Sequence, residues 1–377
     1  MAHIRLDLAH AYKPNPQRDE DYALLPLKMN FRDGGAYALL GPSGCGKTTL
    51  LNIVSGLVKP SHGSVTFDGV DVTARTPQQR NIAQVFQFPV IYDTMTVAEN
   101  LAFPLRNRGV AADRIAQRVG KIAEMLELSG QLNSRAAGLA ADAKQKISLG
   151  RGLVREDVSA VLFDEPLTVI DPHLKWQLRR KLKQIHNELK LTLIYVTHDQ
   201  VEALTFAEEV VVMTRGRAVQ IGTASELFER PQHTFVGHFI GSPGMNFLPV
   251  QWRGGGLSVA GRNLTLAGTA TRAAGATLLG VRPEYVTLAA PHQDGAIPAV
   301  VTQAQDIGTY WLITARVGDG DGDGDSGDGS ATATVVRARL SPQQTIPRIG
   351  DAVWLGIVGP HTCFYKNEQL ITQETPA

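Results

Sequence analysis

A glycine-rich segment, Gly41-Pro42-Ser43-Gly44-Cys45-Gly46-Lys47-Thr48-Thr49, constrains this 377-residue chain more than any other feature. It follows the pattern Gly, four residues, Gly-Lys-Ser/Thr, which binds nucleotide phosphates. The apolar run 36–40 before it predicts a buried strand, and the apolar residues within 50–57 recur at helical spacing. A strand-to-helix turn directs the unpaired amides and the positive dipole end of the new helix at one point. We therefore expect Lys47 to reach the β- and γ-phosphates and the Thr48 hydroxyl to bind Mg²⁺, rather than an ordinary glycine-rich turn.

Charge, cysteines and hydropathy narrow the class of protein. The net charge is +1 and the basic residues are scattered, so neither nucleic acid nor an anionic membrane surface is indicated as a partner. Cys45 and Cys363 are isolated thiols, which suits a reducing cytosol. No apolar run approaches the ~18 residues that span a bilayer, and the first residues show no signal-peptide core. We expect any membrane role to be peripheral, through a protein partner.

Polar residues end three other apolar runs that predict strands. Continuous apolar runs are typical of parallel strands buried on both faces, and functional groups of α/β sheets collect at the carboxyl ends of strands. We therefore expect a shared site, in which Asp164 faces the metal and Glu165 polarises an attacking water. The alternative, polar residues that merely close a strand or a turn, is weaker beside an independent phosphate-binding segment. The residues in question are Gln87, the pair Asp164-Glu165 and His198.

The sequence predicts two domains. Residues 1–241 alternate strand and helix patterns, and a run of helical periodicity marks a helical insert at about 89–154. From 242 to 377, short alternating segments between turns predict small β-barrels. Within this second domain, 318–330 is a low-complexity Gly/Asp run without EF-hand or nonapeptide spacing. We interpret that run as a flexible loop and not as a calcium site.

The order of these motifs resembles that of the ATPase subunits of ABC transporters, most closely those of sugar importers such as the maltose importer. The resemblance implies an α/β P-loop ATPase domain, with a mixed sheet core and a helical insert, followed by an all-β OB-like (TOBE-type) domain. It extends over nearly the whole chain. The other segments that carry it are 85–87, 95–101, Asp171-Pro172, 239–243, 245–249 and 280–284.

The resemblance implies how nucleotide and metal would be held. Residues 41–49 would bind the phosphates of ATP, and Tyr12 would stack on the adenine, although a lone surface tyrosine is an equal alternative from the sequence. Gln87 would join Thr48 and Asp164 around Mg²⁺ and the attacking water.

Roles in catalysis and assembly follow from the same resemblance. Glu165 would be the catalytic base, and His198 would contact the γ-phosphate. Asp171 would lie at the interface between two ATPase subunits. The insert at 89–154 would receive a cytoplasmic helix of an integral-membrane permease, and an extracytoplasmic solute-binding protein would act indirectly. The chain would then be peripheral, on the cytoplasmic face of the inner (plasma) membrane.

One segment departs from the family pattern. The signature Leu-Ser-Gly-Gly-Gln opens the helix that donates to the γ-phosphate held by the opposite subunit, but here this register is Leu139-Ala140-Ala141-Asp142-Ala143. Ala140 removes a hydroxyl donor, Ala141 adds a Cβ, and Asp142 would cap the helix amides. Two unit charges about 4 Å apart repel by ~4 kcal/mol at a surface-like dielectric, whereas a charge-assisted donor contributes ~1.5–3 kcal/mol. We expect a degenerate signature, unless a basic neighbour such as Lys144 neutralises Asp142.

An intact phosphate loop beside a degenerate signature predicts an unlike partner. In a head-to-tail dimer each site takes its loop from one chain and its signature from the other, so a homodimer would have two impaired sites. A heterodimer with a second ATPase of intact signature would keep one. Unequal paired ATPases favour glycerol as the solute, or another polyol, a sugar or glycerol phosphate.

Three alternative functions remain. The first is a soluble ABC-type ATPase that acts on nucleic acid without a permease, against which the charge and the β-barrel extension argue. The second is a small-molecule kinase, which the strand-end His198 and the accessory domain do not fit. The third is a regulatory subunit with weak hydrolysis, which the intact Lys47, Asp164 and Glu165 disfavour.

Overall fold

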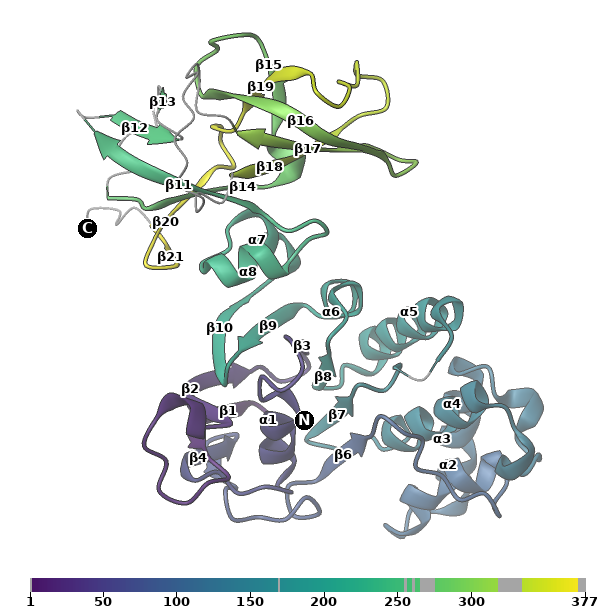
Figure 1. Cartoon of the computed structure of the whole chain (residues 1–377). Helices are drawn as coiled ribbons and strands as arrows, with labels where there is room; N and C mark the ends of the chain where they lie inside the picture. Colours follow the sequence, from purple (N-terminus) through teal and green to yellow (C-terminus); the bar gives the residue numbers. More distant parts are fainter. Residues whose placement is uncertain are drawn as a thin grey trace. The chain divides into compact units, whose positions relative to one another are not determined.

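The computed structural model describes residues 2–168, 170–253, 256–259, 262–264, 275–317 and 334–371. The chain divides into two compact units, 1–224 and 225–377 (Figure 1). The predicted loop at 318–330 lies outside the described residues and stays a prediction.

The first unit is built on two β-sheets, whose strands are β1 (Ile4–His10), β2 (Leu24–Phe31), β3 (Ala36–Leu40), β4 (His62–Phe67), β5 (Val70–Asp71), β6 (Ile82–Val85), β7 (Ala160–Asp164), β8 (Leu193–Thr197), β9 (Glu209–Thr214) and β10 (Arg217–Gly222). The smaller sheet is antiparallel, in the order β2-β1-β4-β5. The larger has the order β10-β9-β3-β8-β7-β6. Its neighbours from β9 to β6 pair in parallel, and β10 pairs antiparallel with β9. The expected mixed sheet is confirmed.

Helices surround the larger sheet, and three of them gather in the predicted insert (Figure 1). The first of the three, α2, begins with a capping box: the Thr96 hydroxyl accepts from Glu99 N (3.1 Å) and Glu99 Oε2 from Thr96 N (2.7 Å). The helices of the unit are α1 (Lys47–Ser55), α2 (Val97–Arg106), α3 (Ala112–Met125), α4 (Ala141–Leu153), α5 (Pro172–Leu189) and α6 (Gln200–Phe206).

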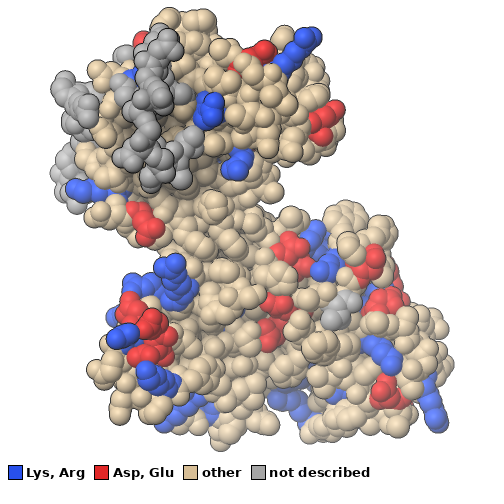
Figure 2. Space-filling model, in the orientation of Figure 1, with Lys and Arg blue, Asp and Glu red and all other residues tan. Residues whose placement is uncertain are grey.

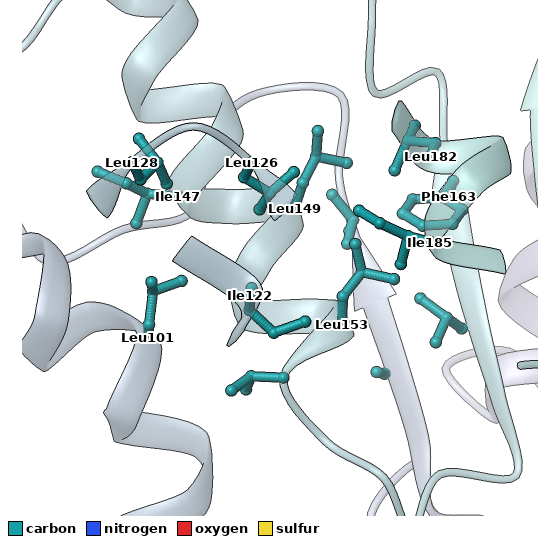
Figure 3. Close-up of a cluster of buried hydrophobic side chains, with 14 of the residues drawn as sticks. Leu101, Ile122, Leu126, Leu128, Ile147, Leu149, Leu153, Phe163, Leu182 and Ile185 are labelled. Carbon is teal, nitrogen blue, oxygen red and sulfur yellow. The ribbon is translucent and has the colours of Figure 1, made fainter. Parts of the chain in front are cut away.

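The insert shares a hydrophobic core with the sheet (Figure 3). Leu101 of α2, Ile122 of α3 and Leu149 of α4 are fully buried in one cluster. The same cluster contains Phe163 of β7 and Ile185 of α5. Full burial of a side chain of this size stabilises the folded chain by about 1.5–3 kcal/mol relative to leaving the side chain exposed. The insert is therefore packed into the unit that carries the phosphate loop.

In its described residues the second unit is all-β apart from α7 (Ala224–Glu229), α8 (Thr234–Phe239) and a short 3-10 turn. Its described strands are β11 (Asn246–Arg253), β12 (Gly256–Val259), β13 (Arg262–Leu264), β14 (Leu278–Val281), β15 (Thr287–Ala289), β16 (Ala296–Asp306), β17 (Trp311–Val317), β18 (Val335–Leu340), β19 (Ala352–Gly356), β20 (Cys363–Lys366) and β21 (Gln369–Leu370). They form two antiparallel sheets, in the orders β13-β12-β11-β14-β20-β21 and β15-β19-β16-β17-β18. Leu248 and Leu279 of one sheet share a core with Ile313 and Leu355 of the other. The expected all-β domain is confirmed.

The boundary between the units differs from the predicted one at 241/242. The segment 225–241, which holds most of α7 and all of α8, belongs to the second unit. The buried Arg282 guanidinium accounts for this, because it donates to the carbonyls of Phe228 (2.9 Å) and Gly237 (3.2 Å). Such contacts between distant segments leave no mark on local sequence pattern.

Candidate functional site

The phosphate loop has the predicted strand–loop–helix form. The buried strand β3 leads into residues 41–46, and α1 begins at Lys47. Gly44 and Gly46 have φ of 77° and 104°, values that favour glycine. A Cβ on Gly46 would also lie 2.6 Å from the carbonyl oxygen of Ala23. The glycines are therefore required by the backbone of this turn.

The side chain of Lys47, the first residue of α1, points back into the phosphate loop. It is 5% exposed, and its Nζ donates to the carbonyls of Gly41 (2.9 Å) and Pro42 (3.0 Å). Among the described residues no acid forms an ion pair with it. Asp164 is near enough for a Coulombic interaction with Lys47, but a buried ammonium without a directly bonded counter-charge is costly. This arrangement fits an anionic ligand such as a nucleotide phosphate.

Thr48 and Asp164 join the start of α1 to the end of β7. Thr48 Oγ1 donates to Asp164 Oδ1 at 3.2 Å, and burial raises the pKa of the Asp164 carboxyl. Hydroxyl and carboxylate oxygens are ligands that Mg²⁺ accepts, usually together with substrate phosphates and water. Within the described ranges no three His, Cys, Asp or Glu side chains are grouped to hold a metal by themselves. The donor set therefore fits a magnesium ion that arrives with a nucleotide.

Glu165 and His198 meet at the adjacent ends of β7 and β8. His198 Nδ1 lies 3.2 Å from Glu165 Oε2, which also accepts from Thr168 Oγ1 (3.3 Å). The Glu165 backbone has a φ of 46°, an uncommon value outside glycine, and its N donates to the carbonyl of Val196 (3.1 Å). Glu165 and His198 are 33 residues apart in the sequence, and the structure brings them together. Their positions at strand ends predict that they share one site.

Tyr12 follows β1 of the smaller sheet, and Gln87 follows β6 of the larger one. Tyr12 is 65% exposed, and its hydroxyl is 3.3 Å from Thr49 Oγ1 in the first turn of α1. Gln87 is half-buried and follows the end of β6 by two residues, so the strand predicted to include it is shorter than expected. The roles of both residues stay predictions.

The segment predicted to be a degenerate signature lies at the start of α4, but its cap differs from the predicted one. The cap position is Ala140, which has extended backbone and no side-chain hydrogen bond. Asp142 lies in the first turn, already helical, so its predicted role as the capping residue is wrong. Lys144 does not serve as its neutralising partner, since Lys144 Nζ pairs with Asp93 Oδ1 at 3.3 Å. The carboxylate remains beside the positive end of the helix dipole.

Asp171 and Gln145 connect the segment that follows β7 to α5 and α4, respectively. Asp171 caps α5 by accepting from His173 N at 2.9 Å. Gln145, which was not predicted from the sequence, is fully buried in α4 and donates to the carbonyl of Pro166 at 2.6 Å, next to Glu165. Its only sequence signal is a polar residue in line with the apolar face of the helix.

Comparisons with known proteins agree with this geometry. Residues 24–168 match the family model described as "ABC transporter", and residues 241–286 match the "MalK OB fold domain". The sn-glycerol-3-phosphate import ATP-binding protein UgpC of Escherichia coli (strain K12) is 41% identical over 334 residues, which cover 88% of this chain and 89% of that protein. UgpC of Salmonella choleraesuis (strain SC-B67) is 38% identical over 339 residues, with the same coverage.

A solved structure shows the same fold for part of the chain. The chain of cbiO1 from Clostridium perfringens, part of an ABC transporter complex, superposes with a TM-score of 0.55 at 26% identity and covers 61% of this chain and 92% of its own. In the described part of this chain no helix has both the length and the apolarity to cross a bilayer. The chain therefore belongs to the ATP-binding subunits of ABC importers of the sugar and polyol (maltose-importer-like) type, which hydrolyse ATP to drive transport.

Proposed function

We propose that this chain is one of two unlike ATPases that together power the uptake of a polyol or sugar. The observation that carries the proposal is the contrast between two helix starts. At α1, the loop glycines, buried Lys47 and the Thr48–Asp164 contact form a phosphate site. At α4, Ala140 offers no hydroxyl and Asp142 places a negative charge in the first turn.

The side chains of this cluster divide the chemistry of hydrolysis among them. The amides of 41–49 and Lys47 hold the phosphates. Mg²⁺, held by Thr48, Asp164 and Gln87, would offset charge on the phosphate oxygens. Glu165 would take a proton from the attacking water, and its contact with His198 holds the carboxylate where β7 and β8 end.

The competent site of the heterodimer takes its phosphate loop from this chain and its signature from the companion. The opposite site combines the companion's loop with α4 of this chain, where a triphosphate would face Asp142 and lack the serine donor. An acid at this point opposes phosphate binding by charge repulsion. One site of the pair then carries most of the turnover.

The test is hydrolysis by the purified full-length chain, alone and with its companion ATPase and permeases in liposomes. We expect background turnover alone and transport-coupled turnover in the complex. Glu165→Gln in this chain is expected to abolish turnover of the complex, whereas the equivalent acid-to-amide change in the companion leaves most of it. Full-rate turnover by this chain alone would refute the unlike partner.

We further propose that the helical insert binds a cytoplasmic helix of the permease. A groove of about 430 Å³ lies between α2 and α3, lined by Ala98, Ala102, Arg106, Ile115 and Val119 among others. Phe88, just before the insert, is 67% exposed. Small and apolar side chains on the groove walls leave room for a helix. Binding there would hold the chain at the cytoplasmic face of the inner membrane as a peripheral subunit.

Replacement of Ala98 by Trp would fill this groove, because Ala98 lines it and is only partly buried. We expect the variant to bind ATP normally but to lose co-purification with the permease. Arg114→Trp, on the exposed surface of α3 and not among the groove residues, is the matched control. Retention of the permease by Ala98→Trp would contradict the assignment.

The solute is inferred from relatives and from the asymmetry. The curated relatives above are named for sn-glycerol-3-phosphate import, and the unequal ATPases favour glycerol. Uptake of labelled glycerol, glycerol 3-phosphate and maltose by cells that lack this chain distinguishes the three solutes. We expect loss of glycerol uptake alone; loss only of another would reassign the solute.

Two alternative functions predict different experimental results. A soluble ATPase acting on nucleic acid would bind it in a salt-dependent way, yet on the face seen in Figure 2 basic and acidic side chains of the first unit are intermixed. A regulatory subunit would bind ATP without essential hydrolysis. Unchanged transport by Glu165→Gln would favour that alternative.

A further inference from the structure

A buried carboxylate that the proposed chemistry does not use lies beside His198. Glu202 is in the first turn of α6 and is 4% exposed. Its Oε2 accepts from Thr197 Oγ1 (2.8 Å) and from Tyr195 OH (3.1 Å), both on β8. Burial and the charge of Glu202 raise the pKa of Tyr195, so the phenol remains the donor. This carboxylate attaches α6 to the strand that ends at His198.

Thr197, which precedes His198, also contacts Asp199, which follows it. Because its hydroxyl hydrogen goes to Glu202, its oxygen is left to accept, and Asp199 N donates to it at 3.0 Å. The Asp199 carboxylate in turn accepts from two amides of the first turn of α6, at 2.7 and 3.1 Å. Both chain neighbours of His198 are therefore held by the bonds that lead to Glu202. The imidazole itself is more exposed and contacts Glu165.

The other oxygen of Glu202 faces the start of a second helix. Oε1 lies 4.0 Å from Lys175 Nζ in the first turn of α5. Lys175 N donates to the carbonyl of Asp171 at 2.9 Å, and the Asp171 side chain caps the same helix. Asp171 is the residue expected to face the other ATPase subunit. One carboxylate thus connects the loop of His198 with the loop at that interface.

An acid is not needed here merely to attach α6. An apolar residue would fill the position without the penalty of burying a charge. Glu202 avoids that penalty only because two hydroxyl donors and one ammonium face it. Its chemistry suits a junction between two loops more than a simple packing contact.

We propose that Glu202 is a positioning residue that holds His198 in register with the Asp171 loop, so that hydrolysis responds to contact with the companion subunit. This inference rests on the role proposed above for His198. Thr197→Val removes the donor at constant shape, and Glu202→Gln keeps an acceptor but removes the charge facing Lys175. The matched control is Lys183→Met, because Lys183 Nζ donates to the carbonyl of Thr205 (2.8 Å) and joins α5 to α6 without touching Glu202.

The first measurement is single-turnover hydrolysis by the full-length chain with its companion, at saturating Mg·ATP. Misplacement of a reacting group by about 1 Å can lower rates roughly 100-fold, so we expect Thr197→Val to lower turnover by roughly 10- to 100-fold without weakening ATP binding. In a His198→Ala background the same change is expected to have no further effect. Losses that multiply in the double variant would show that Glu202 acts independently of His198, which overturns the proposal.

The second measurement does not depend on hydrolysis. In the nucleotide-free full-length chain, the ¹³Cε1–¹H NMR signal of His198, assigned by its loss in His198→Ala, reports the surroundings of the imidazole. We expect Thr197→Val and Glu202→Gln to shift it and Lys183→Met to leave it in place. An unmoved signal in the first two variants would overturn the proposal. If the signals shift as expected but the complex with the companion fails to hydrolyse ATP, the proposed function is refuted and the positioning role stays supported.

Discussion

Two helices of the first unit begin where this family binds phosphate, and their first turns differ in kind. α1 follows a loop with glycines at positive φ and starts with a lysine buried among carbonyls. α4 starts at Ala140 without a capping side chain and carries Asp142 in its first turn. Both N-termini have free amides and a positive dipole end. The difference therefore lies in side chains, not in helix geometry.

The comparison teaches that a helix N-terminus is only part of a phosphate site. α1 adds a cation, a hydroxyl next to Asp164 and glycines that let an anion approach. α4 adds an acid and two methyl groups. In the proposed head-to-tail dimer the two helices would serve opposite sites, so their inequality in one chain predicts inequality between the sites.

The largest expected effect is at the acid beside the competent loop. General-base catalysis contributes typically 10²- to 10⁴-fold, so Glu165→Gln is expected to lower turnover of the heterodimer by about that factor while ATP stays bound. Glu124→Gln, an exposed acid on α3, serves as the control. If turnover by the Glu165→Gln variant equals that of the Glu124→Gln control, this chain's phosphate loop does not form the working site.

The next effect concerns the phosphate loop itself. Lys47→Ala removes charge-assisted bonds worth about 1.5–3 kcal/mol each, which corresponds to roughly 10- to 150-fold weaker Mg·ATP binding by calorimetry. Lys59→Ala removes an exposed lysine just after α1 and is expected to change nothing. Equal affinities of the two variants would break the contrast between the helix starts.

Restoration of the signature would erase the contrast. The triple change Ala140→Ser, Ala141→Gly and Asp142→Gly is expected to raise hydrolysis by the homodimer about 10-fold or more, since repulsion of ~4 kcal/mol per close charge pair is removed. Two new glycines near a helix start cost up to about 1 kcal/mol each, so the melting temperature is measured in parallel. Unchanged hydrolysis in a folded variant would show that the lost signature is not what limits the homodimer.

The smallest expected effect is on the stability of the chain, through Asp164, the acid proposed to bind magnesium. Because burial raises the pKa of Asp164 in the folded chain, the fold binds that proton more readily than the unfolded chain does. Stability contributed by this carboxyl therefore falls as the pH rises from its unfolded pKa through its folded pKa. Asp164→Asn is expected to raise the melting temperature of the nucleotide-free chain at neutral pH, by roughly 2–4 °C if the gain is about 1 kcal/mol.

The same variant is expected to lose the stabilisation that Mg·ATP gives the unmodified chain, because an amide is a poorer magnesium ligand than a carboxylate. Thermal unfolding with and without Mg·ATP at pH 4 and pH 7 measures both effects. A variant that is less stable than the unmodified chain without nucleotide at pH 7 would contradict the expected direction of the change.

The phosphate loop, the paired acids and the OB-like domain were predictable because each depends on local pattern. A glycine is required wherever φ is positive, as at Gly46, and a buried parallel strand such as β7 is a continuous apolar run. The altered signature was visible for the same reason. The residue types at 140–142 were enough to show the departure from the family pattern.

Other features are invisible to such patterns. The cap of α4 at Ala140, the placement of 225–241 with the second unit and the burial of Gln145 and Glu202 depend on which distant segments pack together.

The sequence by itself determined that this chain has a phosphate loop, strand-end acids, and alanine and aspartate residues at 140–142. Only the tertiary structure decided that Thr48 meets Asp164 across 116 residues, that Glu165 meets His198, and that a buried carboxylate stands behind that histidine. The physical reason is that sequence periodicity assigns a side chain to a face of its own element. The partner of that side chain is set by how the sheet orders its strands and by which helices cover them.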